Sequence, residues 1–143
     1  DWSSDVCSSD LQEETKERAG FRRYSETWLG RRRYLPGIQS QDWGKKSFAE
    51  RCALNTPIQG TAADILKLAL GRIITGLPER PWLRPLLQIH DELVFELPEA
   101  RVPEAVSFIR ACMEKQPFPE FDVPIVAEAA VGLRFGEMKE LAD

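Results

Sequence analysis

The chain has 143 residues, of which 43% are hydrophobic and 29% charged, and its formal net charge is −4. This length suits one modest domain or a part of a larger one, with enough apolar residues for a core. Its three cysteines, far apart and odd in number, form neither a zinc-ligand spacing nor a disulfide framework. No membrane-span-length apolar run and no signal peptide is visible, so we expect a cytoplasmic protein with reduced thiols and no membrane partner.

Residues 1–11 differ from everything that follows. They are rich in Ser and Asp and lack hydrophobic periodicity. They resemble translated adapter sequence from the end of an assembled gene fragment, so we expect a non-native leader on a chain truncated at its N-terminus. A genuine disordered leader is the alternative. Residues 11–19 are charged and helix-prone, and Gly20 is the expected end of that helix.

A hairpin is expected next, with residues 21–28 and 32–36 as its arms. Leu29-Gly30 separates the arms, and glycine is favoured in such turns because it adopts positive φ without strain. The two aromatic side chains here, Trp28 and Tyr34, are expected to pack against the protein.

Positive charge is concentrated in this part of the chain. Residues 21–51 hold eight Lys and Arg against three acids, so they carry +5 in a chain of net charge −4. A basic segment in an acidic chain is expected of a phosphate-binding face, and the arginines of the hairpin could bind phosphate through their planar forks. From the residues alone, a solvated charged loop explains the segment equally well.

A long, broken helix follows a loop that contains Pro and Gly. Ser47 is expected to cap its start, with Glu50 three residues later completing a capping box. Pro57 interrupts the helical pattern, because its ring clashes with the preceding turn, and Gly60 weakens the pattern again. The helix is expected to restart near Thr61 and to run to about Thr75 along an apolar stripe.

Two uncharged amides, Asn55 and Gln59, straddle this break. An amide can contact the minor-groove acceptors, which occur in every base pair, without favouring one sequence. Alternatively, both amides satisfy backbone groups that Pro57 leaves free. One turn further on, Asp64 and Lys67 are expected to form a surface ion pair that contributes little.

The most informative stretch is residues 88–96, in which Asp91 and Glu92 separate two short apolar arms that read as strands. Asp-Glu is poor chemistry for a tight turn, so two carboxylates at a hairpin apex suggest a function. His90, the only histidine, adjoins them, and the arms are expected to form a buried, rigid support. Carboxylates suit Mg²⁺, and Asp91 is the better candidate ligand, since Glu92 should face the other way. A plain solvated turn is the alternative.

The remaining elements complete an α+β fold. A helix from Pro103 to about Lys115 carries a broad apolar face that should cover a sheet. After a loop over residues 116–124, Ile125–Val131 is expected to form a third strand beside the acidic hairpin. We therefore predict an antiparallel sheet of hairpin and third strand, packed by helices, with the broken long helix and the basic hairpin upstream.

The sequence QIHDELVFE at residues 88–96 resembles motif C, the last catalytic motif of family-A, polymerase-I-like DNA polymerases. RCALNTPIQGTAAD at residues 51–64 is similar to another hallmark of that family. So are LGRRRYLP at 29–36 and VGLRFGEMK at 131–139. The resemblance covers roughly residues 12–143, in the order of the C-terminal end of a polymerase domain.

The resemblance implies a palm subdomain and DNA-directed DNA polymerase activity in replication or repair. Asp91 matches the motif-C aspartate that binds metal, and Glu92 matches its neighbouring carboxylate, which plays a lesser part. His90 would help to place the primer terminus; a neutral histidine that packs against the protein is the alternative. Two Mg²⁺ ions, about 3.5–4 Å apart, would act on the attacking and leaving oxygens, and this chain holds only part of their site.

The resemblance also implies the partners: primer–template DNA and deoxynucleoside triphosphates, bound by a monomeric protein of a bacterial or phage-like cytoplasm. Arg51, Asn55 and Gln59 would contact primer and template near the 3′ end. The full set of expected DNA-binding residues is Arg31, Arg32, Arg51, Asn55, Gln59 and His90.

Several parts of the family pattern are not found in this sequence. They are motif A with its second metal-binding aspartate, the fingers helix that grips the triphosphate, and the exonuclease regions. We therefore expect residues 12–143 to be the C-terminal, palm part of a polymerase domain, inactive alone. Two alternatives remain: a non-catalytic duplex-DNA-binding module that uses residues 31–46, and an α+β domain whose acidic hairpin is a plain turn.

Overall fold

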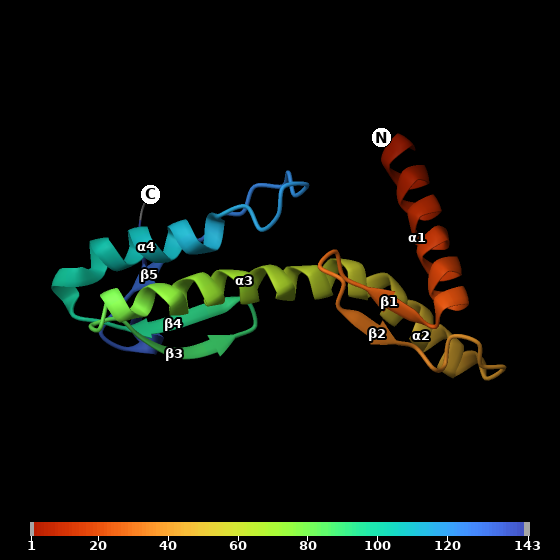
Figure 1. Cartoon of the computed structure of the whole chain (residues 1–143), viewed down its shortest axis with the longest axis horizontal. Helices are drawn as coiled ribbons and strands as arrows, with labels where there is room; N and C mark the ends of the chain where they lie inside the picture. The colour runs from red at the N-terminus through yellow and green to blue at the C-terminus, as the bar shows by residue number, and fades with distance from the viewer. Residues whose placement is uncertain (1, 142–143) are drawn as a thin grey trace. The chain divides into compact units, whose positions relative to one another are not determined.

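The computed structural model describes residues 2–141. The chain divides into two compact units, Asp1–Asp64 and Ile65–Asp143. Within residues 2–141, helices and three two-stranded antiparallel sheets make up the fold, which confirms the α+β class (Figure 1). No helix in the described part of the chain is long and apolar enough to cross a membrane.

The first unit is built from two helices, a short hairpin, a π-helical segment and the first turn of a third helix. Its buried apolar core lies where α1, the end of the hairpin and α2 meet. The elements are α1 (Trp2–Arg22), β1 (Tyr24–Glu26), β2 (Arg32–Tyr34), α2 (Trp43–Asn55), η1 (Thr56–Gly60) and the start of α3 (Thr61–Gly76). The core residues are Ala19, Leu35, Ile38, Ala49, Cys52 and Ala53.

Helix α1 continues past the expected stop at Gly20 and ends at Arg22. The residue that leaves the helix is Arg23, whose φ of 62° is left-handed and whose N–H donates to the carbonyl of Ala19 at 2.8 Å. A glycine within a helix costs only about 1 kcal/mol, so packing of the buried Ala19 can carry the helix through Gly20. The leader expected over residues 1–11 is helical from residue 2 onward, residue 1 lies outside the described residues, and the leader's origin stays a prediction.

The basic hairpin is confirmed, with Tyr24 opposite Tyr34 across β1 and β2. Gly30 lies in the connecting loop with a φ of 82°, a conformation that glycine adopts without strain. The expected packing of the two aromatic residues holds only in part: Trp28 is 66% and Tyr34 71% exposed, but Tyr34 contacts a neighbouring ring. The rings of Tyr34 and Tyr24 form a T-shaped pair at a centroid distance of 6.1 Å, so the two rings pack on the hairpin surface.

Helix α2 starts four residues before the predicted cap at Ser47. Asp42 is the N-cap, and its carboxylate accepts a hydrogen bond from the N–H of Lys45 at 3.1 Å. The capping box expected from Ser47 and Glu50 is therefore wrong, since both residues lie inside the helix. Aspartate caps a helix as well as serine does, so the earlier of two suitable residues determines the start.

The interruption predicted at Pro57 is confirmed, and it takes the form of the π-helical segment η1. Proline has no N–H, so the carbonyl of Ala53 lacks its usual helical donor. The hydroxyl of Ser25, from β1, donates to that carbonyl at 2.9 Å. A hydroxyl from the hairpin thus satisfies the backbone group that the proline leaves free.

At the end of this segment the hairpin and the helix approach each other closely. A Cβ atom added to Gly60 would lie 2.6 Å from Cγ2 of Thr27, closer than real Cβ contacts. Only glycine therefore lets the loop between β1 and β2 rest against the start of α3.

The second unit contains the remainder of α3 and all later elements. They are η2 (Leu77–Glu79), β3 (Arg84–Ile89), β4 (Glu92–Glu96), η3 (Glu99–Arg101), α4 (Val102–Glu114), β5 (Ala130–Val131), η4 (Phe135–Glu137) and β6 (Lys139–Glu140). The end of the long helix predicted near Thr75 is confirmed, since α3 ends at Gly76, and the helix predicted from Pro103 is confirmed as well. The buried apolar residues of the second unit are Ala69, Ile73, Leu83, Ala105, Cys112 and Ala127.

Two arginines of the second unit connect α3 and η2 to α4. Arg72 donates to the carbonyls of Cys112 and Lys115, each at 3.1 Å, and so satisfies acceptors at the end of α4. The guanidinium of Arg80 lies 3.9 Å from the centroid of the Phe108 ring. Burial raises the pKa of the Cys112 thiol, and the nearby cationic charges, Arg72 foremost, oppose that shift.

The third strand predicted over Ile125–Val131 is wrong in its extent and its partner. Only Ala130–Val131 is a strand, and it pairs with Lys139–Glu140 in a sheet of its own. The N–H of Leu141 extends this pairing by donating to the carbonyl of Ala129 at 2.8 Å. A partner about ten residues away closes a shorter loop than the acidic hairpin would require, which favours the local pairing.

The close approach at Gly60 gives a direct test. Gly60→Ala should lower the free energy of unfolding by about 1–3 kcal/mol, because the added methyl overpacks the contact with Thr27. Gly71→Ala, in α3 with open space around its Cβ position, should raise it by about 0.5–1 kcal/mol through helix propensity. Urea unfolding of the two variants would measure both values, and equal effects would contradict the close approach.

Candidate functional site

The acidic hairpin is formed by β3 and β4, whose register ends with Ile89 opposite Glu92. His90 and Asp91 therefore make the two-residue turn, and Glu92 is the first residue of β4. The predicted apex is shifted by one residue, since the sequence suggested Asp91 and Glu92. All three side chains are exposed.

His90 has a left-handed backbone, with a φ of 54°. Histidine is enriched in this conformation relative to most residues, but glycine would adopt it with less strain. Non-glycine residues held in such backbone conformations cluster at functional sites. The turn thus combines an imidazole, two carboxylates and a strained backbone on three successive residues.

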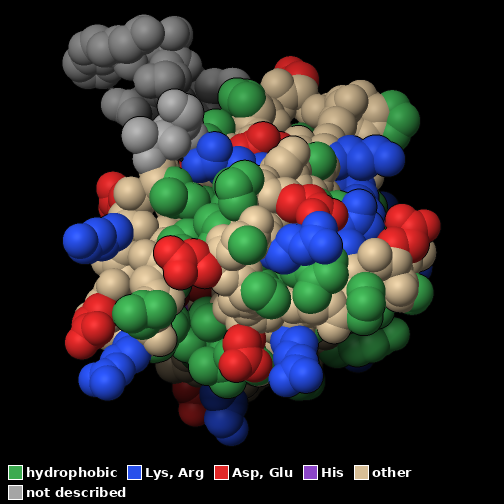
Figure 2. Space-filling model, turned by 90° about the vertical axis from the view of Figure 1, so that its left-hand side faces the viewer, with side chains coloured by type: hydrophobic (Ala, Val, Ile, Leu, Met, Phe, Trp, Pro, Cys, Tyr) green, Lys and Arg blue, Asp and Glu red, His purple; other side chains and the backbone are tan. Residues whose placement is uncertain are grey.

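The buried, rigid support expected for this turn is wrong for β3, which is exposed along its whole length. Leu86 and Leu87 are 54% and 55% exposed, whereas the middle of β4, Leu93–Phe95, is half-buried. Within the described residues β3 pairs with β4 alone, which also leaves it with one unpaired edge. On the face shown in Figure 2, hydrophobic side chains reach the surface among acidic and basic ones.

The carboxylates at this turn can contribute to a metal site without completing one. Asp91 and Glu92 offer the hard oxygen ligands that Mg²⁺ prefers, and Mg²⁺ is often held by one or two carboxylates together with phosphates. Within residues 2–141, no group of three or more His, Cys, Asp or Glu side chains is placed to hold a metal ion.

A second group of predicted site residues lies in the first unit. Arg51, Asn55 and Gln59 are each exposed, and they follow one another at intervals of four from α2 into η1. Side chains four residues apart lie on one side of a helix. Neither amide is hydrogen-bonded through its side chain to another described residue. Since Ser25 satisfies the carbonyl that Pro57 leaves free, the alternative role for the amides is wrong.

The two predicted hairpin arginines both have acidic partners. Nε of Arg32 lies 3.6 Å from Glu26, and its guanidinium lies 4.7 Å from the centroid of the Tyr24 ring. A terminal nitrogen of Arg31 lies 2.7 Å from Oδ1 of Asp64. Both arginine side chains stay more than half exposed, so each keeps donors that face solvent.

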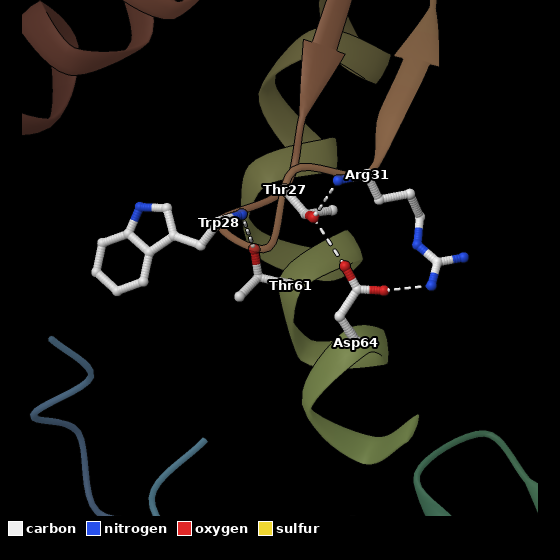
Figure 3. A network of polar contacts seen from close by, with 5 residues as sticks. All are labelled: Thr27, Trp28, Arg31, Thr61 and Asp64. Atoms are coloured by element: carbon white, nitrogen blue, oxygen red, sulfur yellow. Dashed lines mark hydrogen bonds and ion pairs between the residues drawn. The ribbon is translucent and has the colours of Figure 1, made fainter. Parts of the chain in front are cut away.

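Asp64 is the polar residue of this region whose surroundings differ most from expectation. It is 4% exposed, so the predicted surface pair with Lys67 is wrong. The hydroxyl of Thr27 donates to its Oδ2 at 2.7 Å, and the ion pair with Arg31 lies on its Oδ1 (Figure 3). That ion pair is close in distance but lacks hydrogen-bond geometry.

The same contacts hold the loop between β1 and β2. The N–H of Arg31 donates to the hydroxyl of Thr27 at 3.1 Å, and the N–H of Trp28 donates to that of Thr61 at 3.0 Å. Figure 3 shows these residues converging from the loop and from the start of α3. Sequence reasoning missed the cluster; the available signal was Asp64 three residues after Thr61, which puts both on one side of the helix.

The predicted site residues thus form two groups. Those expected to bind DNA through the hairpin and the broken helix lie in the first unit, and the acidic turn lies in the second. The first group is Arg31, Arg32, Arg51, Asn55 and Gln59, and the second is His90, Asp91 and Glu92.

Comparison with known proteins adds independent findings. The model of DNA polymerase family A matches residues 8–137. The thermostable DNA polymerase I of Thermus filiformis is 42% identical over 133 residues, covering 90% of this chain and 15% of that protein. DNA polymerase I of Pseudomonas aeruginosa is 42% identical over 126 residues, covering 87% of this chain and 14% of that protein.

A solved structure is similar as well. It is described as the POL domain of Pol1 from M. smegmatis in complex with DNA primer-template and dNTP. Its TM-score is 0.74 at 40% sequence identity, and the match covers 81% of this chain and 20% of that one. The chain therefore spans about 15% of the length of the curated relatives it matches.

The buried carboxylate gives a second test of the structure. Asp64→Ala should destabilise the chain by about 1–3 kcal/mol, because it leaves the buried Thr27 hydroxyl without a charged acceptor. Glu104→Ala is the control. It removes the ion pair between Glu104 and Arg101, which has the same 2.7 Å length but joins two side chains that are each about half exposed. That control should change stability by at most about 1 kcal/mol. Urea unfolding at high and low salt would compare them, and equal losses would contradict the buried pair.

Proposed function

This chain belongs to DNA polymerase family A, and we propose that it supplies the motif-C carboxylates and part of the primer–template surface of a DNA-directed DNA polymerase. The reaction is transfer of a nucleotidyl group from a deoxynucleoside triphosphate to a primer 3′-hydroxyl, with release of pyrophosphate. The observation that carries the proposal is the turn His90-Asp91-Glu92, strained at His90 and exposed, in a chain that matches the family model over residues 8–137.

In this proposal the acidic turn is the catalytic part of the chain. Asp91 and Glu92 would hold Mg²⁺ through their carboxylate oxygens, with Asp91 as the principal ligand. The bound ion would supply charge stabilisation for the oxygens that react at phosphorus. His90 would donate a hydrogen bond near the primer terminus. The exposure of all three side chains supports this assignment, because each must reach DNA, nucleotide or metal.

The primer–template surface is the second part. Arg51 would bind backbone phosphate, and Asn55 and Gln59 would contact minor-groove acceptors without regard to sequence. Two observations support this role: the three side chains are exposed along one helical path, and the amides are not used within the described residues. The M. smegmatis relative was solved with DNA primer-template and dNTP, which supports both as partners.

The chain would act as part of a larger active site. It spans about 15% of the length of its curated relatives, and two carboxylates at one turn cannot position two metal ions for an in-line displacement. We propose that the 143-residue chain alone does not extend a primer, and that an intact protein works as a monomer in bacterial cytoplasm, in DNA replication or repair.

A non-catalytic duplex-binding module is the second candidate. The +5 charge of residues 21–51 favours it, since phosphate neutralisation alone gives salt-dependent binding. It differs from the polymerase proposal in one respect: binding and any biological effect would be independent of Asp91.

The polymerase proposal is tested with a chimera in which this chain replaces the matching segment of Thermus thermophilus DNA polymerase I, to which it is 42% identical over 120 residues. The chimera should extend a primer with Mg²⁺. Asp91→Asn should lower kcat about a hundredfold or more, as loss of a group acting on the transition state does.

Glu99→Gln is the matched control, because it removes one exposed carboxylate from the same unit. It should leave kcat within a few-fold. An active chimera that tolerates Asp91→Asn would exclude the catalytic role of Asp91, and primer extension by the 143-residue chain alone would contradict the shared active site.

The DNA surface is tested by equilibrium binding of the full chain to a labelled primer–template across salt concentrations. Arg51→Ala should weaken binding and reduce the magnitude of the salt slope by about one, because one phosphate contact is lost. Asn55→Ala should weaken binding with an unchanged slope, since an amide releases no counterion. An equal reduction of the salt slope in both variants would contradict the assignment, and so would unchanged binding in both.

A further inference from the structure

We infer that Asp64 is a positioning residue for nucleic-acid binding: through Thr27 it fixes the loop of residues 27–31 and holds the Arg31 guanidinium ready for a backbone phosphate. This inference rests on the proposed function, because it takes the basic hairpin as part of the DNA surface. It adds a residue buried in the protein, Asp64, to a surface that the sequence assigned to exposed cations and amides.

The conformation of the loop depends on the hydroxyl of Thr27. The N–H of Arg31 donates to that hydroxyl at 3.1 Å, and the hydroxyl donates in turn to Oδ2 of Asp64 at 2.7 Å. The loop backbone is closed on the same residue, since the N–H groups of Thr27 and Gly30 bond within the loop at 2.9 Å each. Removal of the Asp64 carboxylate would leave the central hydroxyl of this arrangement without its acceptor.

The guanidinium of Arg31 is held on one edge and open on the other. Its contact with Oδ1 of Asp64 is 2.7 Å long, and the side chains are 57% and 5% exposed, respectively. In Figure 3 the second terminal nitrogen of Arg31 points away from Asp64. A guanidinium carries five N–H donors in a rigid fork, so one edge can rest on Asp64 while the other binds phosphate.

The other ion pairs of the hairpin lack this arrangement. Glu26 pairs with Arg22 and Arg32, and all three side chains are at least a third exposed. Exposed pairs exchange readily with solvent and order a side chain weakly. The buried carboxylate of Asp64, in contrast, holds Arg31 in a close ion pair before the ligand arrives, and an ordered side chain loses less entropy on binding.

Charge alone predicts the opposite effect, which makes the inference testable by sign. Asp64 carries a negative charge close to Arg31, so a purely electrostatic view predicts that its removal strengthens binding to a polyanion. Positioning predicts that its removal weakens binding, because the loop and the guanidinium lose their fixed orientation.

The experiment measures binding of the full 143-residue chain to a labelled primer–template between about 50 and 200 mM salt. The variants are Arg31→Ala, Asp64→Ala and the double variant, with Glu104→Ala as the control for loss of one exposed negative charge. We expect Arg31→Ala to reduce the salt slope by about one. Asp64→Ala should weaken binding several-fold and reduce the slope in the same direction, and Glu104→Ala should not weaken binding.

The double variant separates positioning from a general loss of structure. We expect Asp64→Ala to add nothing in the Arg31→Ala background, since it acts through Arg31. Tighter binding by Asp64→Ala, unchanged binding, or an equal loss in both backgrounds would overturn the inference.

Two milder variants keep the test decisive if Asp64→Ala does not fold. Asp64→Asn retains an acceptor for Thr27 but loses the charge that holds Arg31, and Thr27→Val retains the charge but removes the hydroxyl. Both variants should weaken DNA binding when Arg31 is present and should have no further effect when they are combined with Arg31→Ala. If Arg51→Ala weakens binding while the Arg31 and Asp64 variants do not, this inference alone fails; if none of them does, the proposed DNA surface fails.

Discussion

The contact of Thr27 with the helix at Gly60 and Asp64 is the constraint on which the first unit depends. The loop can approach only because Gly60 has no side chain, and it stays there because a buried carboxylate accepts the Thr27 hydroxyl. The neighbouring Ser25 then reaches the carbonyl that Pro57 leaves free. A helix interrupted by proline therefore remains continuous, with the hairpin supplying its missing hydrogen bond.

That arrangement leaves Asn55 and Gln59 exposed and unused. A polar group that stabilises the fold is buried and bonded, as Asp64 is, whereas these amides contact no other described side chain through hydrogen bonds. His90 shows a related contrast, because it holds a left-handed backbone that glycine would adopt with less strain. These two amides and His90, all proposed to contact DNA, are thus not explained by the needs of the fold.

The sequence predicts features that depend on neighbouring residues and misses those that depend on distant ones. The break at Pro57, the hairpin at Gly30 and the helix from Pro103 follow from local backbone chemistry, and all three are confirmed. The burial of Asp64 depends on Thr27, 37 residues away, so a helix pattern assigned it to the surface. The third strand failed for a different reason: the sequence suggested pairing with the distant acidic hairpin, whereas Ala130 pairs with the nearby Glu140. The acidic turn was found through its motif, while its exposure could not be read from apolar arms.

The most direct test of the central claim is where a divalent ion binds. Mn²⁺ prefers the same carboxylate and water ligands as Mg²⁺ and broadens the NMR signals of nearby amides. With the full chain bound to primer–template DNA, we predict broadening centred on His90, Asp91 and Glu92 that disappears in Asp91→Asn. Broadening that leaves this turn unaffected, or that persists unchanged in Asp91→Asn, would contradict a metal-binding role for the acidic hairpin.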